Sequence, residues 1–335
     1  MSRISTKLFF SWAGQRSLFW IPITVSSLLM GLFYLPCLIN ENALAVSVTA
    51  ELVSERQMLG TMLMFALLSG YLIFVSLVQH SRSLDALEVI TSLTSNGKIE
   101  ANFQVLADDV RTRLNSIGIW TLPVLLLAAM WGVYQNEGVV QIMWFSQRFL
   151  FVDFVFIFGG CVVWLLIVIV LCWRIPVSIS LARLSRYAPI NLYAMQELRP
   201  LSRISTTDVL IVAGAMAFMP LQALDAEFRL VNYFAGSVVG LLSALVLFFL
   251  PLLGIRENIM AEKTKRLNTL QTELRTIHVH DTQHLELVSA HIERIAAIPN
   301  WPLDLRLVAR AFSYLIIPPM AWIAAALVEN FVDKL

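Results

Sequence analysis

Seven long runs of apolar residues dominate the sequence, and short polar segments separate them. A helix rises about 1.5 Å per residue, so about 20 residues cross a hydrocarbon core that is about 30 Å thick. We therefore predict an all-α, polytopic membrane bundle of seven transmembrane helices. The seven apolar runs are residues 17–39, 57–79, 117–134, 149–173, 207–224, 233–255 and 308–332.

The composition agrees with a chain that lies mostly in a membrane. Of the 335 residues, 58% are hydrophobic and only 14% are charged, whereas about a quarter of the residues in a soluble domain are charged. The net charge is only +1, so the chain has no overall basic field that would attract nucleic acid. We expect the lipid bilayer as its surroundings and no nucleic-acid partner.

The basic residues predict the orientation of the bundle. The segments on one side of the seven runs carry 3, 4, 5 and 8 Lys or Arg, including Arg174 in the third of these segments. These make up 20 of the 24 basic residues, and the opposite side has 4. Under the positive-inside rule, the N-terminus then lies in the cytoplasm and the C-terminus outside, in an inner or plasma membrane.

This topology divides the chain into four parts. Residues 1–16 form a cytoplasmic N-terminus, 17–255 a six-span region, 256–307 a cytoplasmic hairpin, and 308–335 a final transmembrane helix with a short external tail. A first cytoplasmic helical hairpin is expected at 80–115, within the six-span region. Its apolar residues recur at helical spacing on both sides of the turn Ser95-Asn96-Gly97.

The second hairpin, at 256–307, has the apolar spacing of a coiled coil. One straight helix over 256–297 would be about 60 Å long, whereas residues 298–307 reach back only about 33 Å. The helix therefore either breaks near 278–283 into an antiparallel hairpin, which we favour, or lies along the membrane surface. The seam is a candidate partner-binding surface: Leu267, Leu270, Leu274, Ile277, Leu285, Val288, Ile292 and Ile295.

The last run contains Pro318 and Pro319 well inside it. Proline interrupts the backbone hydrogen bonds of a helix, and lipid tolerates the break only against protein or a water-filled cavity. The bend is either an ordinary kink packed against protein or part of a pore. Asp153, one turn inside the outer end of the fourth run, and Asp208, at the inner end of the fifth run, are both expected to reach toward water. We group Asp153 with the two prolines as a candidate pore or hinge residue.

Gly236, Gly240 and Ser243 place small residues at spacings of four and three in the sixth run. Such spacing lets two membrane helices approach closely. The face that these residues form packs either inside the bundle or between subunits, and a homo-oligomer would use the second arrangement.

Histidines cluster at 278–291, where two imidazoles four residues apart could share a metal ion. A solvated or interfacial face is the preferred interpretation, because the expected hairpin turn would separate His280 from His291. The three cysteines, at positions 37, 161 and 172, have no zinc spacing. We expect no metal and no cofactor.

Motifs that carry enzyme chemistry are missing from the sequence. It has no phosphate-binding glycine loop, no His-Glu-x-x-His pair and no Gly-x-Ser-x-Gly elbow. An intramembrane enzyme is therefore the least favoured class of function, and no catalytic residue is assigned.

Two stretches in about the last 140 residues resemble a known group of proteins. Residues 250–256 read Leu-Pro-Leu-Leu-Gly-Ile-Arg with Lys263 downstream, and residues 298–304 read Ile-Pro-Asn-Trp-Pro-Leu-Asp. Together with Glu-Leu-Arg-Pro-Leu-Ser-Arg at 197–203, they resemble a large family of bacterial and archaeal multi-pass membrane proteins to which no activity is assigned. The resemblance implies a charged helix and a Trp-Pro turn before a final span.

Two classes of function are favoured over an enzyme, and the first of them is preferred. The first is an oligomeric channel- or permease-like protein whose proline-broken last helix lines the path. The second is a membrane scaffold or sensor that binds a cytosolic partner through its helical hairpins. The broken last span favours the first class, whereas the scarcity of charges within the spans suits either the second class or a wide, unselective pore.

Overall fold

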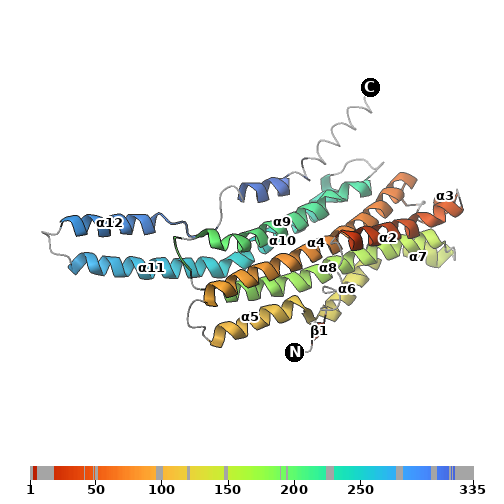
Figure 1. The fold of residues 1–335 in the computed structure, drawn as a ribbon. Coiled ribbons are helices and arrows are strands. Elements are labelled where there is room, and N and C mark those ends of the chain that lie inside the picture. Colours follow the sequence, from red (N-terminus) through yellow and green to blue (C-terminus); the bar gives the residue numbers. More distant parts are fainter. Residues whose placement is uncertain are drawn as a thin grey trace, which may run out of the picture.

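The computed structural model describes most of the chain as helices. The described residues are 3–5, 19–40, 42–47, 49, 52–95, 101–118, 121–146, 150–188, 190–193, 195–223, 230–276, 282–302, 308–316, 318 and 320. The molecule is elongated, and the helices Leu253–Thr276 and Thr282–Ala296 project at one of its poles (Figure 1).

The all-α fold predicted from the sequence is confirmed. The α-helices, and the 3₁₀ helices labelled η, are α2 Trp20–Ile39, α3 Ala43–Val46, α4 Glu55–Ser95, α5 Ala101–Leu114, α6 Thr121–Tyr134, α7 Glu137–Ser146, α8 Phe151–Ser185, η2 Met195–Leu198, α9 Arg199–Ala217, η3 Met219–Ala223, α10 Leu230–Phe249, η4 Leu250–Leu252, α11 Leu253–Thr276 and α12 Thr282–Ala296. Two strands of three residues, β1 Arg3–Ser5 and β2 Ser116–Gly118, form one antiparallel pair.

Within the described residues, five helical stretches are long and apolar enough to cross a membrane. They are Trp20–Ile39, Glu55–Ser92, Phe151–Ser185, Met195–Leu221 and Gly240–Thr276. The predicted third run forms α6, which has only 14 residues, and the last run is described at 308–316, 318 and 320. The protein therefore has the helices of a multi-pass membrane protein, whereas the count of seven spans stays a prediction.

Helices α4 and α8 continue well beyond the predicted runs. The sequence places the end of one span at residue 79 and of another at residue 173, but α4 continues unbroken to Ser95 and α8 to Ser185. At 41 and 35 residues, both exceed the length that a hydrocarbon core about 30 Å thick requires. The first half of the predicted 80–115 hairpin is thus a direct extension of α4, and α5 packs against both α4 and α8.

Two separate hydrophobic cores lie along these long helices. One is built on the first halves of α4 and α8 together with α2, and its buried residues include Phe33, Met62, Phe65 and Val155. The other joins the second halves of α4 and α8 to α5, α9, α11 and α12. Its buried residues include Leu87, Val110, Leu181, Leu201, Ile255 and Ile295. We call them the first core and the second core.

Helices α11 and α12 lie side by side at one pole of the molecule (Figure 1). The Nζ atom of Lys263, in α11, donates hydrogen bonds of 2.8 Å to the carbonyl oxygens of Ala296 and Ile298, which end or follow α12. Near the other end, Nε2 of His284 lies 3.4 Å from a carboxylate oxygen of Glu273. Lys263, early in α11, contacts the end of α12, and Glu273, late in α11, contacts the start of α12. The two helices therefore run antiparallel, as a hairpin and not as one continuous helix.

Gly254 lets the start of α11 touch α8. A Cβ atom at this position would collide with the carbonyl oxygen of Ala182 in α8 and would lie 2.7 Å from Oγ of Ser185. A backbone carbonyl inside a helix has little freedom to move aside. Only glycine, which has no Cβ atom, therefore fits at position 254 while the two helices stay in contact.

We predict that Gly254→Ala lowers the free energy of unfolding by about 1–3 kcal/mol, the usual cost of overpacking. Thermal unfolding of the purified protein in detergent would measure it as a lower melting temperature. Gly31→Ala is the control, because a Cβ there meets nothing within 4 Å. Equal melting temperatures for the two variants would contradict the proposed contact.

Candidate functional site: a buried ion pair between three helices

A fully buried ion pair joins α8 to α9. The guanidinium of Arg174 donates two hydrogen bonds to the carboxylate of Asp208, from Nε to Oδ1 at 2.7 Å and from Nη2 to Oδ2 at 2.8 Å. The side chains of Arg174 and Asp208 are 1% and 0% exposed. This two-point geometry matches the fork of a guanidinium to both oxygens of a carboxylate, and it is the strongest form of such a pair.

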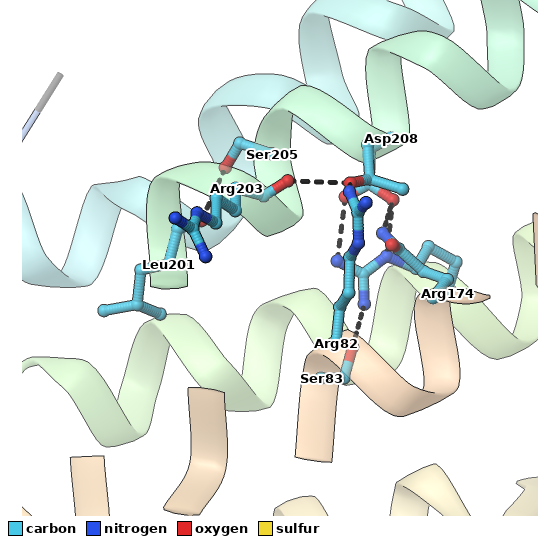
Figure 2. Close-up of polar contacts among 9 residues, drawn as sticks. Arg82, Ser83, Arg174, Leu201, Arg203, Ser205 and Asp208 are labelled. Carbon is cyan, nitrogen blue, oxygen red and sulfur yellow. Dashed lines mark hydrogen bonds and ion pairs between the residues drawn. The ribbon is translucent and has the colours of Figure 1, made fainter. Parts of the chain in front are cut away.

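Helix α4 supplies the remaining partners of the ion pair (Figure 2). Nη1 of Arg174 donates to Oγ of Ser83 at 3.1 Å, and the amide of Gln79 donates to Oδ1 of Asp208. Both α4 residues are fully buried. Because charges in an apolar interior require hydrogen bonds on all sides, these contacts fix the relative positions of α4, α8 and α9. We call Gln79, Ser83, Arg174 and Asp208 the ionic cluster.

The ionic cluster lies near the boundary between the two cores. Along α4, the buried residues of the first core end at Leu72 and those of the second begin at Ala86. Along α8, the first core ends at Val163 and the second begins at Trp173. The cluster therefore marks the level at which one packed unit gives way to the other.

Two expectations from the sequence are wrong at this site. Arg174 is expected in a solvated segment after the fourth run, and Asp208 is expected to reach water, yet both are buried against each other. A usable signal was present, because residues 79, 83, 174 and 208 are polar residues at those ends of the second, fourth and fifth apolar runs that the predicted topology places on the cytoplasmic side. Such ends lie at about one level of the membrane, but which side chains face each other depends on how the helices are rotated.

Asp153, the candidate pore or hinge residue, lies in the first turn of α8 and is buried, so the expectation that it reaches toward water is wrong. Its Oδ1 accepts hydrogen bonds from the backbone N–H of Thr49 at 2.9 Å and from the Thr49 hydroxyl at 2.8 Å. It thereby ties the segment before α4 to the start of α8, where a helix N-terminus favours negative charge. Its Oδ2 has no hydrogen-bond partner within the described part of the chain.

The proline pair of the last run is described in part. Residues 308–316 are helical, and Ala311 and Leu315 pack against Val209, Ala244 and Phe248 of α9 and α10. Pro318 is helical and buried, and Pro319 lies outside the described residues. The role of Pro318 and Pro319 in a pore or hinge stays a prediction.

The small residues of α10 include one close contact inside the bundle. A Cβ atom at Gly240 would lie 2.8 Å from the sulfur of Met216 in α9. Ser243 is half-buried, and the surroundings of Gly236 lie outside the described side chains. At Gly240, therefore, the small side chain serves the packing of α10 on α9.

The predicted seam residues of the second hairpin vary in burial. Val288 and Ile295 are buried, Leu267, Leu270, Leu274 and Ile292 are half-buried, Leu285 is 37% exposed, and Ile277 lies outside the described residues. Leu267, Leu270 and Ile295 contribute to the second core. The seam is therefore used partly for internal packing, and other positions of α12, such as Leu287, are exposed.

The histidine cluster is described at His284 and His291. His284 contacts Glu273, whereas His278 and His280 lie outside the described residues. Within the described part of the chain, no group of three or more His, Cys, Asp or Glu residues is placed to hold a metal ion.

The two stretches that carry the family resemblance meet in space. The guanidinium carbon of Arg256 lies 4.8 Å from the centre of the Trp301 ring. Lys263 contacts the carbonyl of Ile298 and, at 3.3 Å, Oδ1 of Asn300. These residues hold the turn after α12 against the start of α11. The two stretches therefore form one structural element at the base of the α11–α12 pair.

The ionic cluster holds three helices together through charged groups that are buried away from water and hydrogen-bonded to each other. The chain matches no protein-family model, and neither a curated protein nor a solved structure is similar to it. The resemblance of the last 140 residues to a membrane-protein family therefore stays a prediction. The function of the protein has to be inferred from its own residues and their geometry.

We predict that Arg174→Met or Asp208→Leu alone lowers the free energy of unfolding by about 3–5 kcal/mol, because each leaves one buried charge unpaired. The double variant should be markedly more stable than either single variant. The free energies of unfolding of the two single variants and the double variant can be measured by titrating dodecyl sulfate into a neutral detergent. Together with that of the unchanged protein, they form a double-mutant cycle.

Arg186 and Glu257 provide the control. Nε of Arg186 lies 2.7 Å from Oε2 of Glu257, but both side chains are about half exposed. Breaking this pair should therefore lower the free energy of unfolding by less than about 1 kcal/mol. Additive effects of the Arg174 and Asp208 substitutions would contradict the coupling that the geometry implies.

Proposed function

We propose that this multi-pass membrane protein is a scaffold or sensor that binds a protein partner through the α11–α12 hairpin. The observation that carries the proposal is the second core, which is built outside the first and includes residues of both α11 and α12. Helices that served only to cross a membrane would not need such an extension. From the distribution of basic residues, we place this extension on the cytoplasmic side.

The hairpin is held rigidly enough to present a defined surface. Helix α11 follows α10 through the 3₁₀ turn η4, so it is mechanically continuous with an apolar helix. Its base is held by Lys263 against the end of α12 and by Ile255 and Ile259 in the second core. A rigid element loses little conformational entropy on binding, which favours affinity.

Helix α12 presents an exposed face with one large apolar side chain. Leu287 is 67% exposed, and His284 and His291, one turn before and one turn after it, are also exposed. An apolar anchor with polar neighbours is the usual centre of a helix-to-groove contact. We therefore assign Leu287 as the centre of the partner-binding face.

We predict that Leu287→Asp weakens partner binding at least about tenfold, because it places a charge where an apolar anchor is buried. Photo-crosslinking in intact cells, from a photoreactive residue at Ala290 on α12, would measure the yield of a defined crosslinked species. The fold should survive, since the Leu287 side chain is exposed in the free protein.

Thr282→Asp is the matched control. It adds the same carboxylate to the same helix, at an exposed first position where negative charge is favourable. The proposal is wrong if Leu287→Asp and Thr282→Asp give the same crosslinking yield as the unchanged protein.

A second candidate function, an oligomeric channel- or permease-like protein, is favoured by one observation. Oδ2 of buried Asp153 has no hydrogen-bond partner within the described part of the chain. An unsatisfied buried carboxylate oxygen is costly unless water, a proton or a cation reaches it. A conduction path that passes Asp153 would supply such a partner.

For this candidate we predict that Asp153→Asn lowers ion flux into liposomes at least about tenfold, as expected when a path loses its charged group. Asp108→Asn, at an exposed position of α5, should leave the flux unchanged. The mass of the particle in detergent supplies the second readout. A strictly monomeric particle without flux would contradict the oligomeric channel.

A further inference from the structure

We infer that a cleft beside the ionic cluster binds a phosphate group, carried either by an anionic lipid headgroup or by a free phosphate ion. The cleft has a volume of about 480 Å³ and lies between α4, α9 and helix 308–316. The residues that matter for binding are Arg82, Asp85, Arg203, Leu210, Arg310 and Tyr314. The described residues that line the cleft belong to helices other than α11 and α12, so this inference does not depend on the proposed partner.

Three arginines from three different helices point to an anionic ligand. Arg82 comes from α4, Arg203 from α9 and Arg310 from helix 308–316, and Asp85 is the one acidic residue among the described residues that line the cleft. Three guanidinium groups around one cavity repel one another, and one carboxylate compensates for only one of them. Phosphate suits such a cluster, because arginine binds its oxygens through two parallel hydrogen bonds.

Two of the three arginines, Arg203 and Arg310, have exposed side chains without an acidic partner in the described part of the chain. Arg82 donates to the hydroxyl of Thr207, the residue before Asp208 (Figure 2). A ligand that bound Arg82 would therefore sit one residue away from the ionic cluster that locks α4, α8 and α9.

The surroundings favour a phosphate that is attached to a lipid. Leu210 and Tyr314 line the same cleft as the arginines, and Leu210 belongs to a helix that is apolar enough to cross a membrane. The cleft thus combines a cationic part with an apolar wall at the end of a span. Basic pockets between membrane helices are known to bind acidic headgroups in this way.

The test uses the full-length protein, delipidated in a neutral detergent, with three probes. These are dioctanoyl phosphatidic acid, inorganic phosphate and, as the zwitterionic control, dioctanoyl phosphatidylcholine. The rise in melting temperature with probe concentration gives the affinity, because a ligand that binds only the folded state stabilises it. We expect a rise with phosphatidic acid, weakened by added salt, and none with phosphatidylcholine.

Substitutions locate the site. Arg203→Gln and Arg310→Gln should each weaken binding about tenfold, as expected for the loss of one charge-assisted contact, while Arg203→Lys should weaken it less. Arg183→Gln removes an equally exposed arginine from α8, outside the cleft, and should have no effect. Since these side chains are exposed, the melting temperatures without ligand should stay close to that of the unchanged protein.

The outcomes separate the two sources of phosphate. Arginine-dependent binding of phosphatidic acid, without binding of inorganic phosphate at the same concentration, supports a lipid headgroup. Equal, arginine-dependent binding of both supports a free phosphate ion. The inference is overturned if Arg203→Gln and Arg310→Gln bind both probes as the unchanged protein does, or if Arg183→Gln weakens binding equally.

Discussion

The contact between Arg174 and Asp208 constrains the rest of the structure. Both groups are removed from water, and each is favourable only while the other is in place, because an unpaired charge in this environment is strongly unfavourable. Ser83 and Gln79 complete the hydrogen bonds from a third helix. The mutual arrangement of α4, α8 and α9 therefore gives both charged groups their hydrogen-bond partners. A slide of one helix by a single residue would break the two-point geometry and leave two buried charges unsatisfied.

This constraint connects the two halves of the molecule. The first core packs α2 against the beginnings of α4 and α8, and the second core packs the ends of these helices against α5, α9, α11 and α12. Since α4 and α8 are continuous through both cores, and the ionic cluster fixes them at the boundary, a displacement in one half must move the other. The cleft with Arg82, Arg203 and Arg310 lies at this boundary. A ligand there would act on the helices where the two halves are joined.

The sequence predicted which helices form better than it predicted the residues at which they begin and end. A length argument excluded one straight helix standing off the membrane, since residues 298–307 could not return from its tip, and it left the antiparallel hairpin and a helix along the membrane surface as alternatives. The ends of α4 and α8 were placed too early, because hydropathy records where apolar residues stop and a helix continues wherever tertiary packing supports it. The third run is apolar over 18 residues, but its helix has only 14, since residues 116–118 pair with β1 instead.

Apolar runs and the spacing of apolar residues by themselves determined that this protein is helical and suited to a membrane. These properties are local, because each helix must satisfy its own backbone hydrogen bonds in lipid. Only the tertiary structure decided which polar residues meet. Arg174 and Asp208 are 34 residues apart, and Gln79 is 129 residues from Asp208. Whether such side chains reach water or each other depends on the rotation and depth of each helix, which packing across all of them sets together.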